Sequence, residues 1–439
     1  MTLDITGRVL RPGDDGFDDA CTGYQLALPH RPDLVVAAAG TADVVAAVRH
    51  AAEHGLPVAV QATGHGRAAP IEGGVLIHTG AMDEVQVDPA TRTAWVGAGT
   101  RWEKVVAAAA RHGLAPPSGS SPHVGAVGYT LGGGLGLLAR RRGYAADHVR
   151  EFELVTADAR VHRLTPGAEL FRALLGGGGN FGVVTGMRIG LLPITRVYGG
   201  GLYFPASSRV LAAWRDWTAG VPDELTSTVG MVPMPDLPMV PEPLRGRHVV
   251  HIRVVFEGDA ETGERLVAPL RAAGPVLLDT LGVLPYTETG TISGDPPFAH
   301  AYTGRSAMLA DLGPGDVDTV YELAGPDAAV PCVVQVRHLG GALARPSAAV
   351  IGHRDARYAL HVLSALDDAD PGKIAEAHRG LIEALHPMGT FLNFHYGPAT
   401  DEQVRAAFAP DVYADLARLK ARHDPDTRFH AGFTIPPAV

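Results

Sequence analysis

The stretch VAVQATGHGRAAP, Val58 to Pro70, is the most informative part of this chain. Its first residues are β-branched or small and predict a strand. The strand runs into a turn of small residues that carries one histidine, His65. Because glycine has no Cβ and tolerates positive φ, Gly64 and Gly66 allow the backbone to approach a bound molecule closely. The stretch therefore predicts a strand that ends in a ligand-binding turn.

Two further glycine-dense segments follow along the chain. GSSPHVGAVGYTLGGGLG covers residues 119–136, and GGGGNFGVVT covers residues 176–185. Flexible linkers carry serine and other polar residues, whereas Tyr129 and Leu131 lie between the glycines of residues 119–136, the second glycine-dense segment of the chain. The third segment, residues 176–185, places its glycines where a strand begins, which indicates close backbone approach. We therefore predict buried loops that pack against a flat ligand.

The run GHGRAA, residues 64–69, also matches the G-x-G-x-x-A pattern of dinucleotide-binding domains. That pattern requires a helix to start at the glycines, so that the helix N-terminus meets a pyrophosphate. Here residues 70–74, PIEGG, interrupt a helix instead. A diphosphate can still bind the successive N–H groups of such a turn. For His65 taken alone, an ordinary surface turn is the competing interpretation.

Composition limits the class of protein. A length of 439 residues favours two domains, and 46% hydrophobic with 19% charged residues is typical of globular proteins. The net charge of -10 argues against nucleic acid as a partner. The chain shows neither a membrane-spanning run nor a signal-peptide pattern, and Cys21 and Cys332 make no disulfide framework. We expect a cytoplasmic protein without a membrane partner, and the histidines show no metal-ligand spacing.

The hydrophobic pattern changes near Pro193. Before it, the pattern predicts short strands at 34–37, 58–62 and 75–79, a helix capped by Thr41, and a helix over 101–112 with a Thr100–Glu103 capping box. After it, apolar residues alternate with period two at 248–258 and 332–340. Helices are predicted at 207–219, 259–272, 315–324, 371–385 and 402–423. The second half therefore favours an antiparallel sheet with helices on one face.

The order of these motifs resembles that of a known family. TGHGRA is followed by GSSPHVGAVGYTLGGGLGLLARRRGYAADHV, ELFRALLGGGGNFGVVT, FLNFHYGP and YADLARLKARHDPDTRF. This series resembles the berberine-bridge-enzyme-like FAD-linked oxidases, which have the p-cresol-methylhydroxylase-type FAD-binding fold. The resemblance implies an α+β fold with a two-part FAD-binding domain, residues 1–195 and 397–439. Residues 196–396 would form a substrate domain, in which helices cover an antiparallel sheet.

The resemblance also implies how FAD is held. His65 corresponds to the histidine that is joined to the flavin 8α-methyl carbon. Many members carry a second, cysteinyl bond, but Ser121 stands at the cysteine position here, so we expect no cysteinyl bond. This is similar to the 6-hydroxy-D-nicotine-oxidase-like branch, which has a single histidyl link. The implied cofactor-binding residues are Gln61, Ala62, Thr63, Gly64, His65, Gly66, Arg67, Gly119, Ser120, Ser121, Val124, Gly125, Gly128, Tyr129, Gly132, Gly133, Gly182, Val184 and Asn393.

Many family members use the tyrosine of a Y-x-N motif as the base for alcohol substrates. Phe391 stands at that position here and has no proton to titrate. Asn393, His395 and Tyr396 are the remaining catalytic candidates near it. We predict that Phe391 lies near the substrate, together with Gln335 and Arg337, which alternate on a strand and would bind a polar or anionic group. A solvated face or a salt bridge to the covering helices is an equal alternative for Gln335 and Arg337.

These features predict an FAD-dependent oxidase of secondary metabolism. It would transfer hydride to flavin N5 from a small aromatic or amine-bearing metabolite, and O₂ would reoxidise the flavin to give H₂O₂. Two alternatives are a flavin-dependent oxygenase of natural-product biosynthesis and a drug-binding resistance flavoprotein, because a fold does not decide between them. The expected partners are the small-molecule substrate and O₂, and the protein would be a monomer or a homodimer.

Overall fold

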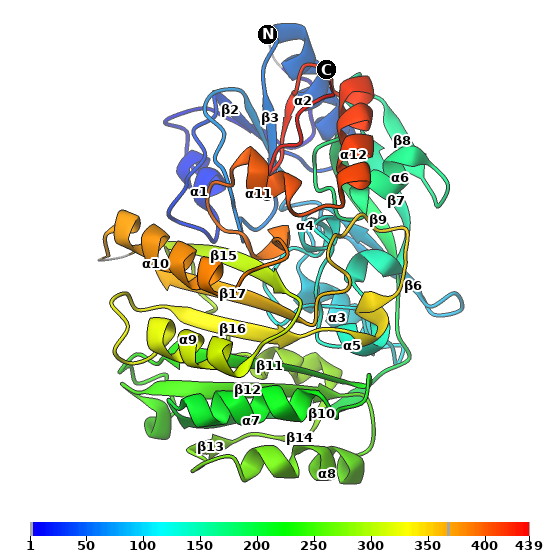
Figure 1. The fold of residues 1–439 in the computed structure, drawn as a ribbon. Helices are drawn as coiled ribbons and strands as arrows, with labels where there is room; N and C mark the ends of the chain where they lie inside the picture. The colour runs from blue at the N-terminus through cyan, green and yellow to red at the C-terminus, as the bar shows by residue number, and fades with distance from the viewer. Residues whose placement is uncertain (1–2, 367–368, 439) are drawn as a thin grey trace.

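The computed structural model describes residues 3–366 and 369–438, which form three sheets with helices around them (Figure 1). Short helical elements connect these sheets. They are α1 (Phe17–Thr22), α5 (Ala139–Arg142), η1 (Ala145–His148), η2 (Glu242–Leu244), η3 (Tyr286–Thr291), η4 (Gly341–Ala344), η5 (Leu392–Phe394) and α11 (Asp401–Arg405). Within the described ranges, every helix is too short or too polar to cross a lipid bilayer.

The first sheet joins the two ends of the chain. Its order is β1 (Arg8–Leu10), β2 (Leu34–Ala37), β4 (Val75–His78), β3 (Val58–Gln61) and β18 (Phe429–His430). All neighbours except β1 and β2 are parallel, and helix α2 (Thr41–His54) packs its apolar face on this sheet. β18 lies beside β3, and helix α12 (Pro410–His423) lies at the same end of the molecule (Figure 1). We therefore propose that residues 1–195 and 397–439 form one folding unit.

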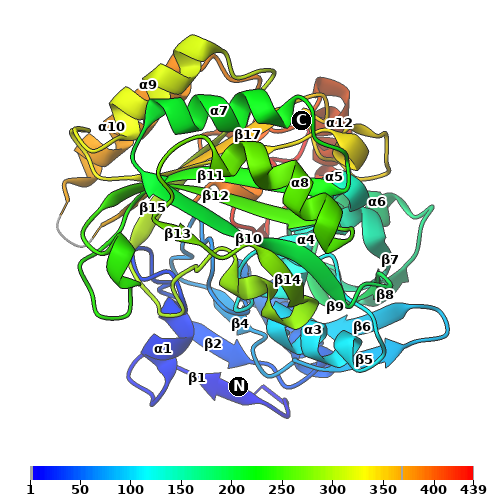
Figure 2. The ribbon, with the colours of Figure 1, turned by 90° about the horizontal axis from the view of Figure 1, so that it is seen from below.

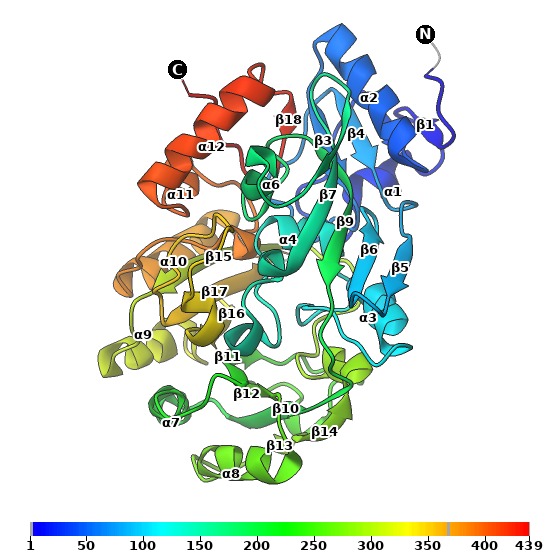
Figure 3. The ribbon, with the colours of Figure 1, turned by 90° about the vertical axis from the view of Figure 1, so that its right-hand side faces the viewer.

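The second sheet is antiparallel and belongs to the N-terminal half. Its order is β5 (Val85–Asp88), β6 (Thr93–Gly97), β9 (Val183–Gly190), β7 (Val149–Val155) and β8 (Val161–Leu164). Helices α3 (Trp102–Ala110), α4 (Ala126–Leu131) and α6 (Glu169–Leu174) share one apolar core with it (Figure 3). Trp102, Phe152 and Phe181 are almost fully buried in that core. The glycine-dense segments thus start or end on elements that are firmly packed.

The third sheet has eight strands and is antiparallel throughout. Its order is β13 (Leu278–Asp279), β10 (Arg196–Pro205), β12 (His248–Phe256), β11 (Leu225–Pro233), β16 (Val333–His338), β17 (Tyr358–Ala365) and β15 (Tyr302–Leu309), and β14 (Gly282–Pro285) also pairs with β10. One face is covered by α7 (Ser208–Thr218), α8 (Ala260–Arg271), α9 (Pro314–Ala324) and α10 (Pro371–Ala384) (Figure 2). The predicted α+β class, with helices over an antiparallel sheet, is confirmed.

The period-two pattern of β12 explains how this sheet has two different faces. Val250, Ile252 and Val254 join the apolar core beneath the helices. The residues between them, His251 and Arg253, point to the opposite face and line a large cavity. One strand thus stabilises the sheet and supplies polar groups to the cavity.

Some predicted local features are wrong. Thr41 does not cap α2; Gly40 does, and the Thr41 hydroxyl donates to Glu153 Oε1 at 2.6 Å. Arg101 caps α3 without a side-chain hydrogen bond, and the Thr100 hydroxyl reaches the Glu84 carbonyl at 3.4 Å. Residues 126–131, predicted as loop, form α4, and the helix predicted over 402–423 is divided into α11 and α12. In both cases the threonine hydroxyl bonds to a residue distant in sequence and does not cap its own helix.

Candidate active site

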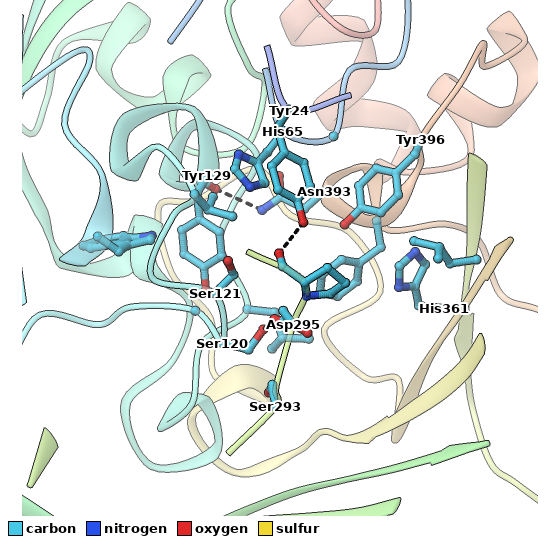
Figure 4. Close-up of a pocket in the computed structure, with 18 of the residues that line it drawn as sticks. Tyr24, His65, Ser120, Ser121, Tyr129, Ser293, Asp295, His361, Asn393 and Tyr396 are labelled. Carbon is cyan, nitrogen blue, oxygen red and sulfur yellow. Dashed lines mark hydrogen bonds between the residues drawn. The ribbon is translucent and has the colours of Figure 1, made fainter. Parts of the chain in front are cut away.

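A cavity of about 1280 Å³ is lined by all three glycine-dense segments and by the polar face of the eight-stranded sheet (Figure 4). This volume exceeds the usual range for one drug-sized ligand, about 300–1,000 Å³. There is therefore room for a large cofactor and for a second molecule beside it.

His65 lies at the top of β3, in the turn that the sequence predicts. Gly64 and Gly66 have φ of 75° and 63°, which is the left-handed region that glycine favours. The imidazole stacks on Tyr24 with ring centroids 3.7 Å apart, and its Nδ1 lies 2.9 Å from Thr63 Oγ1. Its Nε2 is buried and has no hydrogen-bond partner among the described residues. A buried nitrogen without a partner is costly and marks a position where a ligand atom fits.

The protonation state of His65 suits attachment to a cofactor. Burial, and to a lesser degree the positive charges near it, lowers the pKa of His65 to about 3. The ring is therefore neutral at physiological pH and keeps one unprotonated nitrogen. A neutral imidazole has the lone pair that a bond to carbon requires.

Gln61 and Arg67 flank the same turn but direct their polar groups away from its centre. The Arg67 guanidinium donates to the carbonyls of Thr22, Gln25 and Leu28 and to the Gln61 side chain. Gln61 Nε2 donates in turn to the Ala20 carbonyl at 2.7 Å. These two residues hold the turn against residues 20–28.

The second glycine-dense segment packs its apolar residues around the cavity. Tyr129 of α4 meets the edge of Trp102 at 5.6 Å, and its hydroxyl is buried without a partner among the described residues. Asn393 Nδ2 donates to the Tyr129 carbonyl at 2.9 Å (Figure 4). A Cβ on Gly132 would lie only 1.6 Å from Asn393 Oδ1, so this position admits glycine alone. At this segment the group that approaches the glycine backbone closely is thus, in part, the Asn393 side chain.

The structure gathers most of the predicted cofactor residues on the cavity wall. Those that line it are Gln61, Ala62, Thr63, Gly64, His65, Gly66, Arg67, Gly119, Ser120, Ser121, Val124, Gly125, Gly128, Tyr129, Gly132, Gly182, Val184 and Asn393. Gly133 and Phe391 are not among the lining residues, and a Cβ added to Gly133 would lie 3.4 Å from the Phe391 ring. Phe391 is 4% exposed and packs on Tyr144 and Phe394 at 5.8 and 5.3 Å. Phe391 therefore has a packing position, not the place beside the substrate that we predicted for it.

The cysteines lie apart from this cavity. Cys21 and Cys332 are buried and free, and neither belongs to the lining. Burial raises the pKa of each thiol to about 11, so both stay protonated and unreactive. Ser121 lines the cavity where the resemblance would place a cysteine (Figure 4).

Tyr396 directs its hydroxyl into the cavity from the loop after η5 (Figure 4). Its ring packs edge-on against Tyr302 and His361, at 5.3 and 5.0 Å. Burial raises the pKa of Tyr396 above its usual value of about 10. At neutral pH the hydroxyl is therefore protonated, and it can donate a hydrogen bond but cannot act as a tyrosinate base.

The two histidines near Tyr396 have different surroundings. His395 Nε2 lies 3.2 Å from the Pro398 carbonyl, and burial lowers the pKa of His395 to about 4. His361 of β17 stacks on Phe394 at 5.2 Å, and its Nε2 is buried without a partner among the described residues. Burial holds the pKa of His361 well below its usual range. Both rings are neutral at physiological pH, and both residues line the cavity.

Gln335 and Arg337 line the cavity on adjacent outward positions of β16, and Arg337 Nη2 donates to Gln335 Oε1 at 2.9 Å. They therefore face the cavity and not the covering helices.

Several other residues line the cavity without having been predicted from the sequence. Tyr24 and Asp295 lie on loops, and nothing in their local sequence marks them. His251 and Arg253 show the same signal that identified Gln335 and Arg337: polar residues at alternate positions of an otherwise apolar strand. Within the described ranges, no group of three or more His, Cys, Asp or Glu side chains is placed to hold a metal ion.

The buried neutral histidines predict acid sensitivity. Burial lowers the pKa of His30 to about 3 and that of His378 to about 4, both below the unfolded value of about 6.5. Protonation therefore favours the unfolded chain, and stability should fall as pH drops below 6.5. Each such histidine contributes about 1 kcal/mol per pH unit. Denaturant unfolding from pH 7.5 to 5 tests this. His378→Gln should make the slope shallower, and an unchanged slope would contradict the assignment.

Comparison with known proteins agrees with this geometry. Residues 32–165 match the family model described as an FAD binding domain. The chain is 28% identical to (R)-6-hydroxynicotine oxidase of Paenarthrobacter nicotinovorans, over 99% of this chain and 98% of that protein. The crystal structure of 6-hydroxy-D-nicotine oxidase from Arthrobacter nicotinovorans superposes with a TM-score of 0.85 at 26% identity, covering 100% of this chain and 99% of that chain.

A more distant structure shares the fold alone. Glucooligosaccharide oxidase from Acremonium strictum, described with a 6-S-cysteinyl, 8α-N1-histidyl FAD, superposes with a TM-score of 0.86 at 19% identity and covers 99% of this chain and 98% of its own. The domain match, the full-length relatives and the His65 cavity lead to one conclusion: the chain is an FAD-linked oxidoreductase with an FAD-binding domain at residues 32–165, and it is similar over its whole length to 6-hydroxynicotine oxidase.

Proposed function

We propose that this protein is an FAD-dependent oxidase that takes hydride from a small aromatic or amine-bearing metabolite, with FAD attached through His65 and no cysteinyl bond. The observation that carries the proposal is the neutral, half-buried imidazole of His65, whose Nε2 atom is buried at the glycine-lined cavity and has no partner among the described residues. The free, protonated cysteines outside the cavity support a single link.

The side chains near Tyr396 and His361 favour substrates that need no strong base. When bound, the flavin accepts hydride at N5 and passes the electrons to O₂, which gives H₂O₂. An alcohol must lose its hydroxyl proton as hydride leaves, whereas an amine lone pair or an aromatic ring stabilises the product without a base. Tyr396 stays protonated and Phe391 packs in the interior. His361 offers a neutral nitrogen that accepts a hydrogen bond from the substrate.

A comparison of two substrate panels tests this function. Under nitrogen, aromatic amines and phenols should reduce the bound flavin at least ~100-fold faster than sugars, in line with the usual contribution of a positioned base, 10²–10⁴-fold. Stopped-flow absorbance of the flavin measures both rates. Tyr396→Phe should leave the amine reduction within about tenfold, because only a hydrogen bond is lost. Faster reduction by sugars would refute the proposal.

The products separate the oxidase from its alternatives. An oxidase product loses two hydrogens and releases one H₂O₂ per turnover. An oxygenase product gains an oxygen atom, which its mass reveals. A drug-binding protein would bind stoichiometrically and release no H₂O₂.

A further inference from the structure

Two arginines lie side by side on the cavity face of the eight-stranded sheet. In the register, Arg253 of β12 and Arg337 of β16 both stand opposite Thr228 of β11, one from each side. Residues directly paired across antiparallel strands share a face, so both guanidinium groups lie over the same part of the cavity. Both residues line it.

The contacts of these arginines are neutral. Arg253 Nε donates to His251 Nδ1 at 3.2 Å, and Arg337 Nη2 donates to Gln335 Oε1 at 2.9 Å. Arg337 also stacks over Phe394, 4.1 Å from the ring centroid, and its Nη1 is buried without a partner among the described residues. Burial lowers the pKa of Arg337 only to about 10, so it is charged at neutral pH. Within the described ranges, neither arginine has a carboxylate within 4.0 Å.

The carboxylates of the cavity do not neutralise this pair. Asp295 is the nearer carboxylate, since its negative charge raises the pKa of both arginines. Its Oδ2 already accepts a hydrogen bond from the Ser120 hydroxyl at 2.8 Å. Glu288 also lines the cavity and is exposed. Arg67, the third lining arginine, is occupied by backbone carbonyls. Arg253 is buried and Arg337 is half-buried. Two such cations that face one nearby carboxylate leave a positive excess, which is costly unless a ligand supplies the second anion.

The lining of the cavity also includes apolar side chains that are exposed. Five of its lining residues are large, apolar and exposed: Val60, Leu237, Met239, Val283 and Phe298, at 42%, 44%, 65%, 44% and 51%. Exposed apolar groups at a cavity mark a binding surface. The cavity therefore combines exposed apolar side chains with two cations on the sheet.

We propose that the substrate is an aromatic or otherwise apolar metabolite that bears a carboxylate, and that Arg253 and Arg337 together bind this carboxylate. This inference rests on the proposed oxidase function and names its substrate class. Guanidinium groups suit the task because their planar N–H groups match the two carboxylate oxygens. Thr228 lies between them and offers a hydroxyl to the same anion.

Matched ligand pairs test the inference without any turnover. The holoenzyme, kept under nitrogen, is titrated with 3-phenylpropionate against 3-phenylpropanamide, and with indole-3-acetate against indole-3-acetamide. The change in flavin absorbance gives each Kd. Each carboxylate should bind roughly 10- to 100-fold more tightly than its amide, the usual contribution of hydrogen bonds to a charged group. The preference should shrink as salt is added.

Variants then locate the effect. Arg253→Met and Arg337→Met should each reduce carboxylate affinity to near that of the amide, so that the ratio of the two Kd values approaches one. Arg357→Met is the matched control, because it removes the same charge from an exposed side chain paired with Asp311 at the edge of the sheet. It should keep the full preference.

Three outcomes would overturn the inference. They are equal binding of carboxylate and amide by the wild-type protein, an undiminished preference in both arginine variants, and loss of flavin from those variants. The last would assign the arginines to the cofactor. A carboxylate preference without any flavin reduction by the substrate panels would refute the oxidase proposal and leave the anion site standing.

Discussion

His65→Ala should abolish covalent attachment of the flavin. In our proposal the neutral imidazole in the turn after β3 forms the bond, and alanine offers no atom for it. Acid precipitation of the wild-type protein should give a yellow pellet whose mass exceeds that of the polypeptide by one FAD. The variant should give a colourless pellet with the mass of the chain alone. Any remaining flavin should appear in the supernatant.

A second histidine provides the control. His123 lies in the second glycine-dense segment but outside the cavity lining, near Glu103. His123→Ala should keep the yellow pellet. A wild-type flavin that is released into the supernatant by acid would show that the link does not exist. A yellow His65→Ala pellet would show that the link lies on another residue.

Lys420→Met should lower the free energy of unfolding by about 3–5 kcal/mol, the usual cost of breaking a buried ion pair. Lys420 of α12 is fully buried, and its Nζ donates to Asp424 Oδ2 at 2.6 Å and to the Asn180 carbonyl at 2.8 Å. The variant leaves Asp424 as a buried charge without its cation. Asp424 also accepts from Phe429 N at 3.0 Å, so the damage extends to β18. Denaturant unfolding followed by circular dichroism measures the loss.

Two variants test this mechanism. Arg418→Met removes a charge from an exposed position on the same helix and should change stability by less than ~1 kcal/mol. Lys420→Met combined with Asp424→Asn should recover part of the loss, because no unpaired charge is left and the amide oxygen can still accept from the backbone N–H of Phe429. If Lys420→Met alone cost no more than Arg418→Met, the ion pair would not anchor the C-terminal segment.

Sequence periodicity predicted the larger elements because burial is periodic. The helices expected at 207–219 and 371–385 appear as α7 and α10, with ends shifted by one residue. Capping was less predictable, since Thr41 and Thr100 each bond to a residue distant in sequence. A capping motif considers only hydrogen bonds within a few residues. In the folded chain, distant residues compete for the same hydroxyl group, and the motif does not include them.

The candidate site was predictable where the position of a residue depends on its neighbours in the sequence. Gly64 and Gly66 form a turn with positive φ, and His65 lies between them in that turn. Phe391 was different. Its place at the tyrosine position of the Y-x-N pattern suggested that it faces the substrate, but Phe391 comes just before the short helix η5 and packs against Tyr144.

The sequence by itself thus determined the turn of His65, the glycine-dense segments and the two faces of the antiparallel strands. These features follow from steric limits on the backbone and from period-two burial, which act within a few residues. Only the tertiary structure decided that Arg253 and Arg337 meet across Thr228, and that Tyr24 stacks on His65. Strand order and loop placement bring these groups together, because contacts between distant segments depend on how the whole core packs.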